Sequence, residues 1–281
     1  MLQFYDRPLI LSALALAALA GAASATTAER ETEPIACNLS DGFATGVDAY
    51  VGETTSCLAS AETGDVAAVD ARIRALTERH RARYDMPPLD ERVALNEAAR
   101  AHAMDMAARA YAAHMSPEGL NHLDRVRRLD RTGLYGAMGA NITIVPAGTD
   151  PVDAFNALIS DPVNAENLTR NVFTHAGLGV AKSEDGSLYI VQILAQLDGE
   201  LNEPAPMALA RSVRVSAAFA DTRFEQTGWR LETGDAVRLA SGGTSGISAR
   251  RLPAETGLIE IDARLGTEVY ALQGPALSLN Q

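Results

Sequence analysis

The 281-residue sequence predicts an α/β (α+β) protein, in which a layered domain of helices and strands precedes a small all-β domain. Apolar residues recur at helical spacing between residues 66 and 113, and two apolar strands separated by a turn follow at 177–195. From about residue 207 onward, short strand-like runs alternate with turns. The chain is 47% hydrophobic and 21% charged, a composition that excludes wholesale disorder.

Residues 1–25 have the features of a secretory signal peptide. Arg7 precedes an apolar run from Leu9 to Leu19, and Ala23-Ser24-Ala25 matches the small-x-small pattern of a cleavage site. We therefore expect export to the periplasm or the extracellular space of a bacterium, with no stable membrane span after cleavage. An uncleaved membrane anchor is the alternative, because the apolar run approaches the length of a membrane-spanning helix.

Residues 26–63 are polar and show no clear period, which predicts an N-terminal leader. Cys37 and Cys57 are the only two cysteines of the chain. In an oxidising compartment they should form a disulfide that stabilises the fold by about 3 kcal/mol. The alternative is two free thiols. A metal site is not expected, since no further metal ligand lies near either cysteine in the sequence.

The layered domain is expected over residues 66–198. Apolar residues predict helices at about 66–84 and 93–113, and a third helix should start at Pro151 with Asp150 as its N-cap. Glu184-Asp185-Gly186 is a turn signal between strands at 177–181 and 188–195. The second strand is apolar on both faces, so we expect helices to cover both faces of the sheet.

A second domain, β-sandwich-like and accessory to the first, is expected over residues 207–281. Pro204-Ala205-Pro206 predicts a short, stiff linker in front of it. Six segments suit short strands separated by Gly and Asp turns, namely 212–217, 228–231, 236–240, 246–251, 258–263 and 268–272.

The charge and the motifs narrow the function. A formal net charge of −12 disfavours binding to phosphate backbones, so we expect no nucleic-acid partner. The chain has neither a Gly-rich phosphate loop nor a His-Glu-x-x-His zinc motif. His102 lies on an apolar helical face and is predicted to be a buried structural histidine, whereas His122 and His175 are expected at the surface.

Several short motifs occur in order between residues 66 and 198. They are Arg81 with Pro87-Pro88-Leu89, Ala103-x-Asp105-Met106-Ala107, the His114-x-Ser-Pro-x-Gly turn, Asp124-Arg125, Asn141-Ile142 and Asn167-Leu168. In this arrangement the chain resembles the CAP superfamily (cysteine-rich secretory proteins, antigen 5 and pathogenesis-related proteins) in its bacterial form. The resemblance implies a CAP-like α-β-α sandwich, or SCP-like domain, over this region.

The resemblance also implies a surface cleft lined by two histidines and two acidic residues, which binds a divalent metal in some members. His114 matches the first histidine, but Ala140 stands where the family has Glu and Asn164 where it has the second His. Asp161 aligns with the second acidic position of animal and plant members. The predicted binding cleft therefore comprises His114, Ala140, Asn141, Asp161 and Asn164, with no catalytic residue.

This residue set does not suit zinc, which needs three or four N, S or O ligands held together. We accordingly expect no metal and no cofactor, although His114, His122 and Asp124 form an alternative metal set. The leading hypothesis is an exported, non-enzymatic protein that binds a small apolar ligand, a lipid, a peptide or an envelope partner. One alternative is an interaction or adhesion module that uses the β domain. Another is a hydrolase of peptides or cell-envelope material that uses His114 and Asp161.

Overall fold

The computed structural model describes residues 37–61, 64–210, 212–243, 246–248, 252–253 and 255–279. The expected signal peptide and the first part of the leader lie outside the described residues. The helices are α1 (Val47–Ser60), α2 (Gly64–Ala82), α3 (Val93–Arg109), α4 (His122–Leu129), α5 (Pro151–Ser160) and α6 (Pro162–Thr169). The strands are β1 (Asp90–Glu91), β2 (Gly133–Val145), β3 (His175–Lys182), β4 (Leu188–Leu201), β5 (Ala208–Leu209), β6 (Ser212–Val213), β7 (Ala217–Phe219), β8 (Glu225–Glu232), β9 (Arg238–Gly242), β10 (Ile247–Ser248), β11 (Thr256–Leu265) and β12 (Glu268–Leu279).

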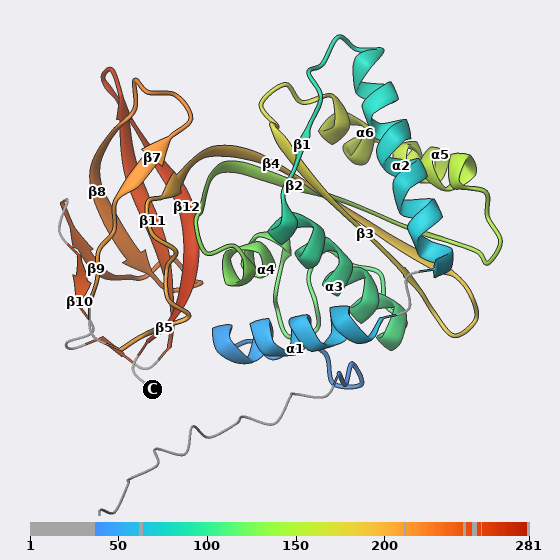
Figure 1. The fold of residues 1–281 in the computed structure, drawn as a ribbon, viewed down its shortest axis with the longest axis horizontal. Helices are drawn as coiled ribbons and strands as arrows, with labels where there is room; N and C mark the ends of the chain where they lie inside the picture. The colour runs from blue at the N-terminus through green and yellow to red at the C-terminus, as the bar shows by residue number, and fades with distance from the viewer. Residues whose placement is uncertain are drawn as a thin grey trace, which may run out of the picture. The chain divides into compact units, whose positions relative to one another are not determined.

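Helices cover both faces of the sheet formed by β1, β3, β4 and β2, as the sequence predicts (Figure 1). Along β4, Leu188, Ile190 and Leu194 pack with residues of α2, α5 and α6. The intervening residues Val191 and Ile193 pack with residues of α3 and α4 on the opposite face. The predicted α-β-α sandwich is therefore confirmed, and β3 and β4 form the predicted antiparallel hairpin around Gly186.

Two glycines of β3 allow α3 to lie directly on the sheet. A Cβ at Gly177 would overlap the backbone of Leu95, and one at Gly179 would overlap the backbone of Arg100. Any side chain at either position would push the helix away from the sheet. The pair also sets the direction of α3, which runs alongside β3 in the same sense.

The structure contains elements that the sequence analysis did not predict, namely α1, α4, α6 and the long strand β2. It also ends α3 earlier than expected, at Arg109 rather than near residue 113. Ala110 adopts a left-handed conformation with φ of 51°, which breaks the helix and starts the loop to α4.

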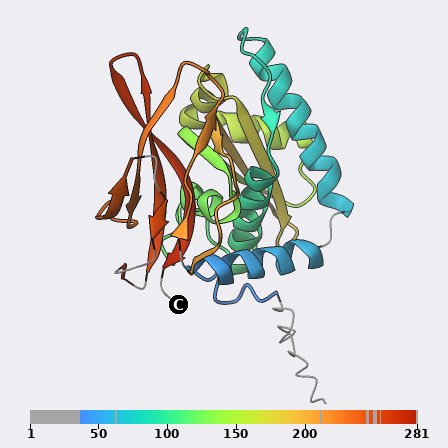
Figure 2. The same cartoon turned by 60° about the vertical axis from the view of Figure 1, so that its left-hand side comes forward.

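The prediction of an aperiodic leader over residues 26–63 was wrong for its second half, which forms α1. Val47, Tyr50, Thr54 and Cys57 are the buried residues of this helix, at spacings of three and four. Because two of these positions carry Thr and Cys, hydrophobicity alone did not reveal the helical period. The predicted Cys37–Cys57 disulfide is confirmed and ties residue 37 to α1, which lies beside α3 in both views (Figures 1 and 2).

The C-terminal region is rich in strands, as predicted, but these strands continue the central sheet. The order β1-β3-β4-β2-β12-β11-β8-β9 runs through a single bridge between Tyr135 of β2 and Gln273 of β12. The long strand β4 also extends beyond the predicted 188–195 and pairs with β7. Leu134 and Leu201 accordingly belong to the same core cluster as Trp229.

Arg127 of α4 and Arg131, two residues after the end of that helix, join this region to the rest of the protein. Arg127 donates hydrogen bonds to the carbonyl oxygens of Ile259 (2.6 Å) and Gly274 (2.7 Å). Arg131 donates to the carbonyls of Ala205 (3.0 Å), Pro206 (2.7 Å) and Ala276 (2.8 Å). The linker is therefore anchored to the protein, while the boundary between residues 198 and 207 stays a prediction. Among the described residues, no helix is both long and apolar enough to cross a membrane.

We predict that Arg131→Gln makes the segment 201–206 the first site of limited proteolysis, at a rate well above that of the unmodified protein. The shorter side chain cannot reach the three carbonyls, so the linker loses the contacts that hold it. Mass spectrometry of the fragments checks this outcome. Arg72→Gln, on an exposed position of α2, serves as the control. Equal cleavage rates in all three proteins would show that Arg131 does not anchor the linker.

Candidate functional site

His114 lies in the loop between α3 and α4 and is exposed to solvent. A chain of polar contacts holds this loop: Arg109 pairs with Asp105 (2.7 Å) and with Glu118 (2.9 Å), and the Tyr111 hydroxyl donates to Asp105 (2.6 Å). Because Asp105 is 2% exposed, this network fixes the loop against the body of α3. The arrangement presents His114 at the protein surface.

A shallow hollow of about 350 Å³ lies beside His114. Its walls come from the loop after α3 and from the end of β2, and the lining residues are Ala112, Ala113, His114, Ile142, Thr143 and Ile144. Apart from His114, none of these side chains titrates. The hollow is therefore an apolar surface with one imidazole at its margin.

The other predicted cleft residues are not among those that line this hollow. Asn141 and Asn164 are buried, and they connect β2 to α6. The Asn141 amide donates to the Asn164 carbonyl (3.2 Å), and the Asn164 amide donates to the carbonyls of Leu158 (2.9 Å) and Ile142 (3.2 Å). The network continues to Gln192, Asn167 and Thr77. These side chains thus satisfy buried polar groups inside the protein.

Asp161 is an exposed N-cap, and Ala140 is a buried residue of β2. The Asp161 carboxylate accepts hydrogen bonds from the main-chain N–H groups of Val163 (2.7 Å) and Asn164 (3.2 Å) at the start of α6. Asp161, which aligns with the family's second acidic position, therefore serves as a helix cap. The structure therefore brings Asn141 and Asn164 together, but not with His114.

The donor set does not fit the divalent metal that binds in some family members. Among the described residues, no group of three or more His, Cys, Asp and Glu side chains is arranged to hold a metal ion. Asp124, part of the alternative metal set, instead forms a capping box with Asn121 at the start of α4. A metal at His114 would find no second protein ligand in the hollow.

Two further histidines, the buried His102 and the partly exposed His122, lie near the loop that carries His114. His102 is 2% exposed, which confirms its predicted burial; its Nε2 donates to the Ala113 carbonyl at 2.8 Å, while its Nδ1 has no hydrogen-bond partner among the described residues. Burial lowers the pKa of His102 to about 3 and that of His122 to about 4, with the positive charge of Arg125 acting in the same direction. His122, expected at the surface, is only partly exposed, and its Nδ1 is buried without a partner among the described residues.

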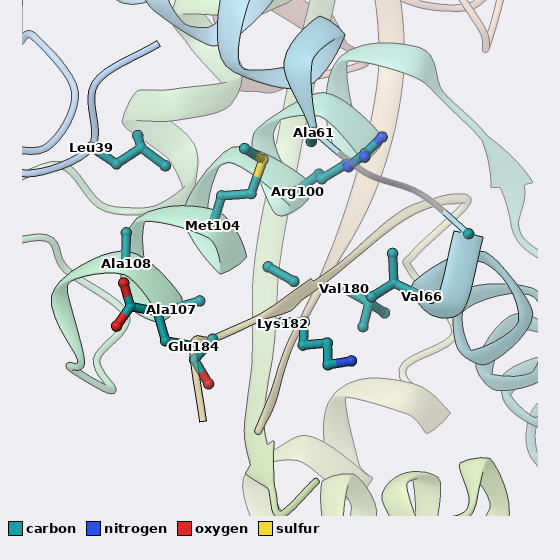
Figure 3. Close-up of a pocket in the computed structure, with 13 residues that line it drawn as sticks. Leu39, Ala61, Val66, Arg100, Met104, Ala107, Ala108, Val180, Lys182 and Glu184 are labelled. Carbon is teal, nitrogen blue, oxygen red and sulfur yellow. The ribbon is translucent and has the colours of Figure 1, made fainter. Parts of the chain in front are cut away.

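A larger cavity of about 580 Å³ lies on the other edge of α3, and the sequence analysis missed it (Figure 3). Its walls come from α3, from the end of β3 and the turn that follows, and from residues near the end of α1 and the start of α2. Arg100, Met104, Val180, Glu184 and Leu39 are among the lining residues. Arg100, a charged residue within an Ala-rich helix, was the one signal in the sequence.

Comparison with known proteins supports the assignment of the layered domain. A sequence model of the cysteine-rich secretory protein family (CAP) matches residues 74–194. The "Uncharacterized protein YkwD" of Bacillus subtilis (strain 168) is 25% identical over 173 residues, which span 62% of this chain and 63% of that protein. The match thus covers less than two thirds of the length of this relative.

Two solved structures are also similar. An outer surface protein from Borrelia burgdorferi is 15% identical with a TM-score of 0.43, and the match covers 47% of this chain and 96% of that one. An extracellular protein containing an SCP domain from Bacillus anthracis str. Ames is 24% identical with a TM-score of 0.39, over 46% of this chain and 40% of that one.

We predict that the free energy of unfolding falls as the pH drops from about 6.5 toward 4.5, because His102 and His122 bind protons more readily in the unfolded chain. Their folded pKa values lie below the ordinary value, so the neutral form stabilises the fold above that window. The loss approaches about 2.7 kcal/mol per histidine at pH 4.5. Denaturant unfolding of His122→Gln at several pH values in this range should show a free energy of unfolding that changes less steeply with pH. His114→Gln is the control, and an unchanged slope in His122→Gln would contradict the prediction.

We also predict that zinc binds the protein only weakly, since the hollow at His114 offers a single ligand. Calorimetric titration should give no dissociation constant tighter than about 10 µM, far from the affinity of a full ligand set. A submicromolar constant that disappears in His114→Ala would show instead that the cleft holds a metal.

Proposed function

We propose that the chain, whose residues 74–194 match a model of the cysteine-rich secretory protein (CAP) family, is an exported, non-enzymatic binding protein of this family. Its ligand at the His114 hollow is a small apolar molecule or apolar group, of the lipid or peptide class. The fold by itself does not select a function, so the proposal rests on the chemistry of the site.

One observation carries the proposal: the hollow beside His114 is lined by apolar side chains and Thr143, with no second titratable group. General acid–base catalysis needs an oriented partner for the histidine, and the candidate partner Asp161 caps α6. Ala112, Ala113, Ile142 and Ile144 can instead exclude water from an apolar group. These features support binding rather than hydrolysis.

Export is supported by independent features of the chain. The sequence of residues 1–25 has the charge, apolar run and small-residue site of a signal peptide. The Cys37–Cys57 disulfide is of a kind that persists mainly in oxidising compartments such as the periplasm.

The test is to fill the hollow and follow the bound ligand. The protein is purified from its native exported fraction, and mass spectrometry identifies the small molecules that co-purify. We predict that Ala113→Trp, at an exposed lining position, lowers the retained apolar ligand by about tenfold or more, because the indole occupies the space.

Ala67→Trp, at an exposed position of α2 away from the hollow, is the matched control and should retain the ligand. His114→Ala should also retain it, because the proposal gives the imidazole no chemical role. Equal retention by Ala113→Trp would remove the hollow as the binding site. Hydrolysis of a peptide or envelope substrate that stops in His114→Ala would establish the enzymatic alternative instead.

A further inference from the structure

The outer edge of β2 is unpaired along its second half. β4 pairs with one side of β2 from Gly133 to Val145, whereas β12 meets the other side at Tyr135 alone. Among the described residues, no further strand pairs with β2. The end of β2, from Ile142 to Val145, is therefore a free sheet edge of the kind that another extended chain can join.

A hydrogen bond from α6 shows which main-chain groups of this edge point outward. The Ile142 carbonyl accepts from the Asn164 amide at 3.2 Å, so it points away from β4. Main-chain directions repeat at every second residue of a strand, so the N–H and C=O of Ile144 point outward as well. Ile144 is 37% exposed, and its outward N–H and C=O have no hydrogen-bond partner among the described residues.

The open part of the edge is short, because the protein itself closes both ends. Asn164 occupies the Ile142 carbonyl at one end. At the other end Pro146 has no N–H, and its carbonyl accepts from the main-chain N–H (3.2 Å) and the hydroxyl (2.8 Å) of Thr149. Between these two ends, Ile144 offers both a donor and an acceptor.

The hollow beside His114 reaches the main chain at this position. Three consecutive residues of β2 line it, namely Ile142, Thr143 and Ile144, and their side chains alternate between the two faces of the sheet. The hollow therefore follows the strand edge and not one face alone. Ile142 packs with the core cluster below α3 and α4, which places the Ile144 side chain on the same face, toward the loop that carries His114.

The charges near this edge favour a neutral or basic occupant. The exposed carboxylate of Asp161 accepts from the main-chain N–H of Asn164, whose side-chain amide reaches the Ile142 carbonyl, so the carboxylate lies near the edge. The whole chain also carries a formal net charge of −12. An anionic ligand such as a fatty acid would meet repulsion here, whereas a cationic side chain would be attracted.

We propose that an extended, neutral or basic peptide binds as an added antiparallel strand at Ile144, with one apolar side chain in the His114 hollow. This inference rests on the function proposed above and names the peptide class for that site. In such a strand, one peptide residue exchanges two hydrogen bonds with Ile144, and its side chain points to the same face as the Ile144 side chain. The peptide side chains before and after it point toward α6, where a basic group can pair with Asp161.

The main-chain groups of Ile144 favour a peptide over a lipid tail. An aliphatic chain lying over this edge would remove the N–H and C=O from water without replacing their hydrogen bonds. A peptide strand supplies both partners, as in other cases of recognition by strand addition. Because the open part of the edge is short, we expect a dissociation constant between about 10 µM and 1 mM.

Peptide titrations followed by NMR test the proposal on the purified exported protein. The probe is the blocked peptide acetyl-Ala-Lys-Leu-Lys-Ala-amide, and the Ile144 amide signal should shift saturably. N-methylation at Leu removes the peptide donor to the Ile144 carbonyl and should weaken binding by about tenfold or more. N-methylation at the second Lys, whose N–H points away from β2, should be tolerated and is the matched control.

Protein variants test the same contacts from the other side. Ile144→Pro removes the outward N–H but no hydrogen bond to β4, so it should weaken binding about tenfold, while Ile144→Val should bind normally. Asp161→Asn keeps a good N-cap and removes the charge. It should weaken the Lys peptide about threefold and leave a peptide with Ala at both Lys positions unaffected. Near-ultraviolet circular dichroism verifies that each variant is folded.

Four results would overturn the proposal. They are equal affinities of the two N-methylated peptides, the absence of a saturable Ile144 shift below about 1 mM probe, dodecanoate that shifts Ile144 where the probe does not, and a dimer in sedimentation that Ile144→Pro dissociates. The last result would assign the edge to a second copy of the chain. The N-methylated peptides keep the test decisive even where Ile144→Pro does not fold.

Failure of strand addition and failure of the proposed function give different results. If strand addition alone is wrong, Ala113→Trp still loses the co-purified apolar ligand, while the two N-methylated peptides bind alike. If the hollow is not a binding site, Ala113→Trp retains that ligand and binds the probe as the unmodified protein does.

Discussion

The hydrogen bonds that the arginines of α4 donate to main-chain carbonyls hold the structure together. Arg128 reaches the Thr45 carbonyl at the entrance to α1 (3.0 Å), while Arg127 reaches β11 and β12. Neither guanidinium pairs with a carboxylate among the described residues, and burial lowers the pKa of Arg127 to about 10. A buried cation without its carbonyl partners would be costly, so the carbonyls and α4 constrain each other. One eight-residue helix thereby fixes the N-terminal helix and the C-terminal strands against the layered domain.

The parts of the fold that were predictable are those in which hydrophobic period and burial agree. Strand β4 has apolar residues on both faces and lies between two helical layers, so its pattern indicated its position. Strand β2 was missed because it contains glycines, which weaken the sequence pattern of a strand. One of them, Gly139, packs against Phe173 and Asn167, which leave little room for a side chain. Helix α4 was missed for a related reason: Arg125, Arg127 and Arg128 are buried in it, contrary to the usual preference of arginine.

The candidate site shows why a motif did not fix which residues lie together at the surface. His114 lies beside a hollow, yet Asn141 and Asn164 face the opposite layer, where they join Gln192 and Asn167 in a buried amide network. An asparagine in a sequence does not reveal whether its amide faces a ligand or a neighbouring carbonyl. Here the carbonyls of Leu158 and Ile142 require donors, and Asn164 provides them. The polar residues at these positions are thus explained by satisfaction of buried groups.

The requirement that buried polar groups find hydrogen-bond partners also applies to the outer edge of β3. At Leu178 the protein itself supplies partners, through Asn96 and Arg74, and the edge is closed to other chains. Next to Gly179 of β3 lies Arg100 of α3, whose guanidinium has no carboxylate partner among the described residues. Arg100 and Leu39, which belongs to the disulfide-linked N-terminal segment, both line the larger cavity. Leu39 lies outside residues 74–194, the region matched to the family. The N-terminal segment therefore does more than stabilise the fold, because its Leu39 forms part of the wall of the cavity beside β3.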